Sequence, residues 1–230
     1  MSKVLLITGA SSGIGAATAR RAAAAGWQVA LSARSADKLD GLVDEIGADR
    51  AVAFPSDVTD FTSQERLAAA VRGRFERIDA VFANAGVGGQ PGGFSAAPVE
   101  PWRQMVDVNI LGVAYTLRAV LPDVKAAKGQ VLITGSIAGR RTIAGSMYSA
   151  TKWAVSAIGY GLREELKGTG VRVTLIEPGL VDTPFFDEPK PDALTADDVA
   201  RSAVFALQQP ASVDVHELVV LPTPPEDAGG

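Results

Sequence analysis

Short, almost entirely apolar runs recur along this chain, and longer stretches with a helical spacing of apolar residues lie between them. The apolar runs predict strands at residues 3–8, 27–33, 51–54, 78–83, 131–134, 171–176 and 217–221. The longer stretches predict helices at residues 16–25, 35–46, 62–75, 99–125, 148–167 and 194–208. Runs that are apolar throughout are typical of strands buried on both faces of a parallel sheet. The alternation therefore predicts an α/β fold, a doubly wound (Rossmann-like) parallel sheet with helices on both faces.

The domain organisation follows from how evenly this pattern runs. No shift in composition marks an internal boundary, so we expect a single domain over residues 1–222. The last residues, 223–230, are rich in proline, glycine and acidic side chains, which predicts a mobile tail. A glycine-rich stretch at residues 86–97 predicts a loop before the longest helix.

Length and net charge limit the classes of partner that this chain is expected to bind. At 230 residues it can bury a full core. Its net charge of −4 and the lack of any basic cluster longer than two residues argue against nucleic acid as a partner. No apolar run reaches the length of a membrane span, and the N-terminal residues lack the apolar core of a signal peptide. We therefore expect a cytoplasmic protein that binds neither nucleic acid nor membrane.

The chain has no cysteine and one histidine, His216. Without cysteine there are no disulfides, thiolate metal ligands or thiol nucleophiles. A Ser-His-Asp hydrolase would have to use His216, and a metal site built from several histidines is excluded. We expect His216 to be a surface or strand-edge residue, no metal to be bound, and proton chemistry to fall to Tyr, Lys, Asp or Glu.

A candidate for that chemistry follows the fifth predicted strand. Tyr148 and Lys152 are four residues apart on a predicted helix, so their side chains project from one face. An ammonium group one turn away is expected to lower the pKa of the phenol, which is about 10 in solution. Ser136, just beyond the strand, can donate to the same substrate oxygen. Together they predict a device that moves a proton on or off a carbonyl or alcohol oxygen, and a core tyrosine beside a solvated lysine is the alternative.

Three glycines, Gly9, Gly13 and Gly15, separate the first predicted strand from the first predicted helix. Such a turn places backbone N–H groups and a helix N-terminus against a pyrophosphate. The spacing is Gly-x-x-x-Gly-x-Gly, whereas the commoner fingerprint is Gly-x-Gly-x-x-Gly, and glycines in such a turn can also serve tight geometry alone.

Further motifs follow in chain order. They are Asp57-Val58, the segment Asn84-Ala85-Gly86, Asn109, the set Ser136, Tyr148 and Lys152, and Pro178-Gly179 followed by Thr183. With the glycine turn, they resemble the motifs of the short-chain dehydrogenase/reductase family over nearly the whole chain. The resemblance implies a nicotinamide-dependent oxidoreductase that interconverts a carbonyl and a secondary alcohol, assembled as a homodimer or homotetramer.

The resemblance also implies a role for each site residue. Tyr148 would be the general acid or base, and Lys152 would lower its pKa and bind the nicotinamide ribose. Ser136 would hold the carbonyl, and Asn109 would hold a water that links Lys152 to solvent. The cofactor-binding residues implied, besides Tyr148 and Lys152, are Gly9, Ser11, Ser12, Gly13, Ile14, Gly15, Asp57, Val58, Asn84, Ala85, Gly86, Pro178, Gly179, Val181 and Thr183.

The end of the second predicted strand indicates which nicotinamide cofactor binds. NAD-preferring relatives commonly carry Asp at the position of Ala33, where it accepts from a ribose hydroxyl. Here Arg34 and Ser35 follow, and a guanidinium suits a 2′-phosphate. We therefore predict NADP(H), held by Arg34 and Ser35. The alternative is that Arg34 is a solvated residue that opens the next helix.

The segment before the last helix is short for the family and holds three prolines within residues 183–194. An ordered lid helix is therefore not expected, and the pocket should be relatively open. Phe185 and Phe186 either wall this pocket or pack beneath the loop. The leading function is an NADPH-dependent carbonyl reductase, with 3-oxoacyl-carrier-protein reductase and a non-catalytic NADP(H) sensor as alternatives. A carrier protein would favour a basic docking patch, for which Arg140 and Arg141 are the nearby candidates.

Overall fold

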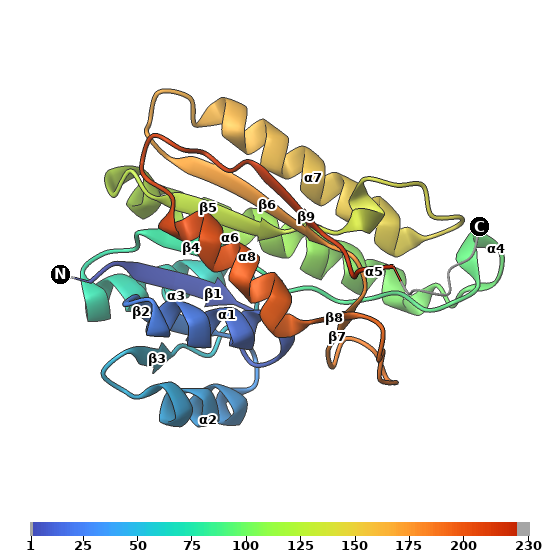
Figure 1. Ribbon diagram of the computed structural model, residues 1–230, viewed down its shortest axis with the longest axis horizontal. Helices are drawn as coiled ribbons and strands as arrows, with labels where there is room; N and C mark the ends of the chain where they lie inside the picture. The colour runs from blue at the N-terminus through green and yellow to red at the C-terminus, as the bar shows by residue number, and fades with distance from the viewer. Residues whose placement is uncertain (1, 225–230) are drawn as a thin grey trace.

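Seven strands form one parallel sheet at the centre of the molecule (Figure 1). The computed structural model describes residues 2–224, so most of the predicted mobile tail, residues 223–230, lies outside the described residues. The strands of this sheet are β1 (Val4–Thr8), β2 (Gln28–Ser32), β3 (Ala51–Ala53), β4 (Ala80–Ala83), β5 (Gln130–Thr134), β6 (Arg172–Pro178) and β9 (Glu217–Val220). Their order in space is β3-β2-β1-β4-β5-β6-β9, and every neighbouring pair is parallel. The predicted doubly wound sheet is confirmed.

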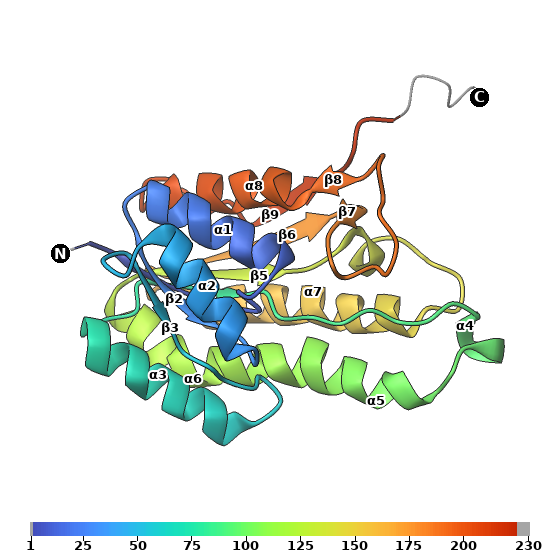
Figure 2. The same cartoon turned by 90° about the horizontal axis from the view of Figure 1, so that it is seen from below.

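Helices cover both faces of the sheet. They are α1 (Gly13–Ala24), α2 (Ala36–Ile46), α3 (Phe61–Phe75), α4 (Gly93–Ala96), α5 (Glu100–Val106), α6 (Gly112–Ala126), α7 (Met147–Glu165) and α8 (Ala196–Gln208). Figure 2 shows α1, α2 and α8 on one side of the sheet and α3, α6 and α7 on the other. The two helical layers account for the burial of both faces.

Burial on both faces explains why the strands are apolar throughout. Along β1, Leu5 and Ile7 belong to the core cluster under α1 and α8, whereas Val4 and Leu6 belong to the cluster under α6 and α7. All four side chains are buried. Because successive side chains of a strand point to opposite faces, one strand supplies both cores.

The strand order reverses between β1 and β4, which are neighbours in the sheet but far apart in the chain. The connections that leave these two strands run to opposite faces, so a crevice remains at the carboxyl edge of the sheet. The glycine turn follows β1 and Asn84 follows β4, so both lie at this crevice. The fold thereby brings the predicted cofactor loop and the predicted Asn-Ala-Gly motif together.

The longest predicted helix is continuous from Glu100 to Ala126, with a π-helical segment, Asp107–Leu111, between α5 and α6. By length and composition alone this helix could cross a membrane, because its most apolar window has a mean hydropathy of 1.3. Its α6 part packs against α3, β4 and β5, as the core helix of a globular protein does. Nothing in the sequence pattern predicted the π-helical segment.

Three small elements were not predicted either. The short α4 lies within the predicted loop, and β7 (Val181–Asp182) pairs in parallel with β8 (Leu194–Thr195). Between these two strands, residues 183–193 form only turns and bends, which confirms the expected lack of a lid helix. His216 immediately precedes the edge strand β9, as predicted, and does not line the main cleft of the molecule.

Candidate active site

A cleft opens at the carboxyl edge of the sheet, over the crevice between β1 and β4. Every residue predicted to bind the cofactor lines it except Gly15. Of the predicted catalytic residues, Ser136, Tyr148 and Lys152 line it, while Asn109 does not. Lining residues that the sequence did not assign are Ala33, Ser56, Val87, Val108, Thr134, Gly135 and Pro184. Phe185 and Phe186 also line the cleft, so they wall the pocket.

The start of α1 offers unpartnered donors to one part of this cleft. Ser12 is the N-cap residue of α1, but its side chain makes no capping hydrogen bond. The first turn of α1 contains no acidic residue. The backbone N–H groups at this helix end therefore have no side-chain acceptor, which is the environment that a pyrophosphate requires. The residues present fit a dinucleotide cofactor at this place.

Close packing behind the turn explains why Gly15 does not line the cleft. A Cβ atom on Gly15 would lie 2.3 Å from the carbonyl oxygen of Gly9 and 2.7 Å from Nδ2 of Asn84. That Nδ2 donates to the carbonyl oxygens of Thr8, at 3.2 Å, and Gly9, at 3.3 Å. Gly15 thus lets α1 approach the ends of β1 and β4. It shapes the cofactor turn from behind.

A second polar part of the cleft is formed by residues that come after β2 and β3. Arg34 and Ser35 follow β2, separated from it by Ala33, and both are exposed. Asp57 follows β3, and its Oδ1 accepts from the backbone N–H and the hydroxyl of Thr59 at 2.9 and 2.8 Å. The structure therefore places the predicted phosphate-binding pair and the predicted acidic residue in one cleft.

Tyr148, Lys152 and Ser136 meet beyond the end of β5. Both Tyr148 and Lys152 are on α7, and Nζ of Lys152 lies 5.7 Å from the centroid of the Tyr148 ring. The hydroxyl of Ser136 is close enough to the Tyr148 phenol to lower its pKa, and it accepts from the backbone N–H of Ala138 at 3.1 Å. Lys152 is buried and donates to the carbonyl oxygen of Thr134 at 2.8 Å. The three predicted groups therefore form one cluster.

Burial dominates the acid–base properties of this cluster. Desolvation raises the pKa of Tyr148 to about 12, and the hydrogen bond with Ser136 opposes this rise only in part. Desolvation also lowers the pKa of Lys152 from its ordinary value of 10.5 to about 8. The sequence predicted that Lys152 would lower the pKa of Tyr148. In the structure described the pKa of Tyr148 is raised, because desolvation of the phenol outweighs the hydrogen bond with Ser136, and the effect of Lys152 on the phenol stays a prediction.

Comparison with known proteins agrees with the family and the fold. Residues 3–193 match the family model described as short chain dehydrogenase. The chain belongs to the short-chain dehydrogenase family. An uncharacterized oxidoreductase of Staphylococcus haemolyticus is 40% identical over 225 residues, which cover 96% of this chain and 97% of the relative. Serine 3-dehydrogenase of Agrobacterium fabrum is 35% identical over 244 residues, which cover 100% of this chain and 97% of the relative.

Solved structures of similar proteins share the fold. The alcohol dehydrogenase from the archaeon Thermococcus sibiricus, complexed with 5-hydroxy-NADP, has a TM-score of 0.90 at 34% identity and covers 98% of this chain and 100% of its own. The 3-ketoacyl-(acyl-carrier-protein) reductase from Brucella melitensis, complexed with NADH, has a TM-score of 0.87 at 29% identity and covers 95% and 96%. The predicted family is thus confirmed, while the substrates named for these proteins differ.

In this short-chain dehydrogenase, Asn109 lies behind the cluster of Ser136, Tyr148 and Lys152. Its side chain is buried within the π-helical segment. Oδ1 accepts from the backbone N–H of Val87 at 2.9 Å, and Nδ2 donates to the carbonyl oxygen of Val87 and to Oγ1 of Thr151, both at 3.0 Å. Asn109 therefore ties the loop after β4 to α7, where Thr151 precedes Lys152. The water that Asn109 would hold remains a prediction.

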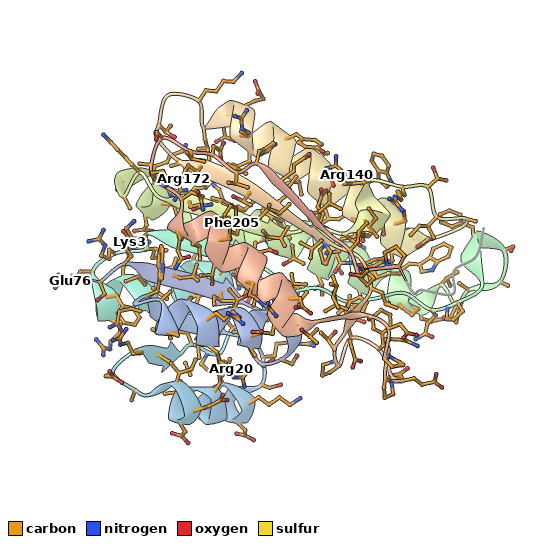
Figure 3. All side chains as sticks on the ribbon, viewed as in Figure 1. Lys3, Arg20, Glu76, Arg140, Arg172 and Phe205 are labelled. Atoms are coloured by element: carbon orange, nitrogen blue, oxygen red, sulfur yellow. The ribbon has the colours of Figure 1, made fainter. Side chains whose placement is uncertain are left out.

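A buried carboxylate beneath the loop after Ser136 was not predicted. Glu177, on β6, is 0% exposed, and its Oε2 accepts from Nη1 of Arg140 at 2.7 Å. Arg140 also pairs with Glu217 on β9 at 2.9 Å, and Figure 3 shows it between α7 and β9. Burial raises the pKa of Glu177, and the hydrogen bond and charge of Arg140 oppose that rise.

This carboxylate also reaches α7, the helix that carries Lys152. The hydroxyl of Ser156, one turn after Lys152, lies 3.3 Å from Oε1 of Glu177. Glu177 therefore links β6 to α7 and, through Arg140, to the loop after Ser136. The sequence ended this strand before the glutamate, because a charged residue after an apolar run gives no signal that it is buried.

Proposed function

We propose that this protein is an NADPH-dependent carbonyl reductase, which acts in reverse as a secondary alcohol dehydrogenase. The observation that carries the proposal is the side chain of Tyr148, which lines the cleft together with Ser136 and stands one helical turn from Lys152. This cluster lies in the same cleft as the uncapped start of α1. Membership of an oxidoreductase family with small-molecule substrates supports the proposal.

The residues of the cluster divide the proton chemistry between them. NADP(H), when bound, supplies or accepts the hydride at the substrate carbon. Tyr148, with a pKa of about 12, holds its proton at neutral pH and donates it to the carbonyl oxygen as a general acid. Ser136 accepts from the backbone at Ala138, so its own hydroxyl proton is directed to Tyr148 or to the substrate oxygen. Lys152, with a pKa of about 8, is largely protonated at pH 7 and stabilises the phenolate that remains.

The comparisons support NADP(H) as the cofactor, as the sequence predicted, because several similar structures hold NADP or a derivative of it. Preference for NADP(H) over NAD(H) is part of our proposal, since the B. melitensis reductase holds NADH. The preference rests on Arg34 and Ser35, which are exposed at the cleft beside Ala33. A guanidinium there attracts a 2′-phosphate, and Ala33 presents no carboxylate to repel it.

The main rival function is reduction of a 3-oxoacyl group on a carrier protein. A carrier protein is acidic, so this function favours a basic docking patch beside the cleft. Arg140, one of the two predicted candidates, is already paired with Glu177 and Glu217. Of the predicted pair, this leaves only Arg141 for a docking patch. We therefore favour a small carbonyl substrate over an acyl group on a carrier protein. The sensor alternative predicts no turnover, although Ser136, Tyr148 and Lys152 are all in place.

We also propose that the enzyme assembles as a dimer or tetramer through α6 and α7. On α7, Trp153 is 50% exposed, and Tyr160, Ala157 and Gly161 are exposed on the same helix. Large aromatic side chains beside small ones suit close packing against a second copy of the chain. Sedimentation at micromolar concentration tests this, and a monomer would refute it. The cytoplasmic location remains a prediction from the sequence.

Tyr148→Phe tests the proposed reaction. The substitution keeps the ring, so the variant should fold and bind NADPH, but it removes the hydroxyl and should cost about 10²–10⁴ in kcat. NADPH consumption with a panel of aldehydes and ketones is the measurement. Tyr115→Phe is the control, because Tyr115 packs against Phe61 on α3 outside the cleft, and it should keep full activity. Activity of Tyr148→Phe within a few-fold of wild type would contradict the mechanism.

A further inference from the structure

Two phenylalanines form an aromatic wall beside the catalytic tyrosine. The centroid of the Phe185 ring lies 5.7 Å from that of Tyr148, at an interplanar angle of 61°. The ring of Phe186 lies 5.2 Å from that of Phe185, and both side chains line the cleft. Phe185 is nevertheless 41% exposed. An exposed aromatic face beside the reacting hydroxyl is an apolar surface that a ligand would cover.

Neighbouring groups hold the Phe185 ring in this position. A Cβ atom on Gly88 would lie only 2.9 Å from Cε1 and Cζ of Phe185, so the ring rests directly on the Gly88 backbone. On the same segment, Nζ of Lys190 lies 5.6 Å from the ring centroid of Phe186. Pairing of β7 with β8 ties both ends of this segment. These contacts therefore fix the position of the aromatic wall in the cleft.

The charged groups of the cleft lie away from this wall or are already engaged. The charged residues that line the cleft are Arg34, Asp57 and Lys152. Arg34 follows β2 and Ser136 follows β5, which are three strand positions apart, or about 14 Å at the usual strand spacing. Lys152 is buried and donates to a backbone carbonyl. Of the charged residues that line the cleft, only Lys152 lies near this wall, and it is already engaged with the Thr134 carbonyl and with Tyr148.

The basic side chains near the aromatic wall are not available as counter-ions for a substrate either. Arg140 pairs with Glu177 and Glu217 at 2.7 and 2.9 Å. Arg141, the next residue, is exposed and does not line the cleft. Lys190 lies over Phe186, which is the ring of the pair that does not contact Tyr148. Lys152 is engaged with the Thr134 carbonyl and with Tyr148, so a carboxylate placed against the Phe185 ring would lose hydration with little compensation.

We propose that the substrate of this site is an uncharged aldehyde or ketone with an apolar group, preferably aromatic, and that Phe185 contacts this group and sets specificity. The group packs against the Phe185 ring while the carbonyl oxygen meets the Tyr148 hydroxyl. This inference rests on the proposed reductase function and names its substrate class. It separates this enzyme from the A. fabrum relative, whose named substrate, serine, carries a carboxylate.

A matched pair of substrates tests the inference. Ethyl benzoylformate and benzoylformate share a phenyl ketone and differ in an ester against a carboxylate. In the wild type, kcat/KM for the ester should exceed that for the acid by about tenfold or more. Phe185→Ala should lower kcat/KM for the ester by about three- to tenfold, mainly through KM, because the aromatic contact is lost. The same variant should change kcat/KM for butan-2-one much less.

Phe205→Ala is the matched control for this substitution. Phe205 is 52% exposed on α8, outside the cleft, and is labelled in Figure 3. Phe205→Ala should leave kcat/KM unchanged for both ethyl benzoylformate and benzoylformate. NADPH binding, followed by fluorescence, and the melting temperature show whether each variant keeps its fold and cofactor site. If Phe185→Ala does not fold, Phe185→Leu keeps an apolar side chain without the ring and should shift KM in the same direction.

The possible outcomes distinguish failure of the substrate-class inference from failure of the proposed reductase function. Equal or faster turnover of the acid would overturn the inference and leave the reductase function standing. An unchanged KM for the ester in a folded, NADPH-binding Phe185→Ala variant would overturn the role of Phe185. Failure of the wild type to consume NADPH with these substrates or any other carbonyl would refute the proposed function itself, and the inference with it.

Discussion

Burying the charged amine of Lys152 lowers the free energy of unfolding, and replacing Lys152 should reveal the size of this effect. Its pKa is 10.5 in an ordinary environment and falls to about 8 in the folded protein, because the amine is buried. With the folded pKa below the unfolded one, the unfolded chain binds more protons between about pH 8 and 10.5, so stability rises with pH through this window. Below pH 8 the cost of burying the charge is present in full. At 1.36 kcal/mol for each pKa unit, it is on the order of 3 kcal/mol.

Lys152→Met removes the titrating amine and keeps an apolar stem of similar length. Between pH 7 and 9.5, the free energy of unfolding of the wild type should rise by about 2 kcal/mol relative to that of the variant. Urea unfolding without cofactor measures this difference. Tyr148 contributes little in this range, since its pKa values of 10 unfolded and about 12 folded both lie above it. The variant should also lose turnover, because no amine remains to stabilise the phenolate.

Stability at pH 7 gives a second readout of the same substitution. The variant should be at least as stable as the wild type, because removing the buried charge offsets the lost hydrogen bond to Thr134. Lys38→Met, at an exposed position on α2, is the control and should follow the wild type at every pH. Parallel curves for the wild type and Lys152→Met would refute the reasoning, since they would mean that the amine keeps its hydration in the folded protein.

Four further variants test the cofactor site and the packing around it. Ala33→Asp combined with Arg34→Ile should cost about one to two decades in kcat/KM with NADPH and favour NADH, because a carboxylate repels the 2′-phosphate; equal use of both cofactors by the wild type would contradict this. Gly15→Ala should lower the melting temperature and weaken NADPH binding, since its Cβ would lie 2.3 Å from a backbone carbonyl oxygen. Gly41→Ala, with open space around it on α2, should instead raise the free energy of unfolding by roughly 0.5–1 kcal/mol. Glu177→Gln should lower the free energy of unfolding by about 1–3 kcal/mol by weakening a buried ion pair, and an unchanged denaturant midpoint would argue against this.

The fold class and the main site motifs could be predicted from the sequence because their signals are local. A strand buried on both faces leaves an apolar run, which is why residues 3–8 were identified as a strand that supplies both cores. Tyr148 and Lys152 could be paired because four residues make about one turn of any α-helix. The glycine turn could be placed because a strand and a helix flank it. Each of these inferences needs only residues that are close in the chain.

Only the tertiary structure decided which groups are charged, paired or covered. The pKa of Tyr148 rises rather than falls because segments distant in the chain bury it. Glu177 is paired with Arg140, 37 residues away in the chain, and Asn109 with Thr151, 42 residues away. Phe185 walls the cleft because the Gly88 backbone receives its ring. Hydration, ion pairing and close packing depend on neighbours that folding brings together from different strands and helices, and the order of residues along the chain does not record those neighbours.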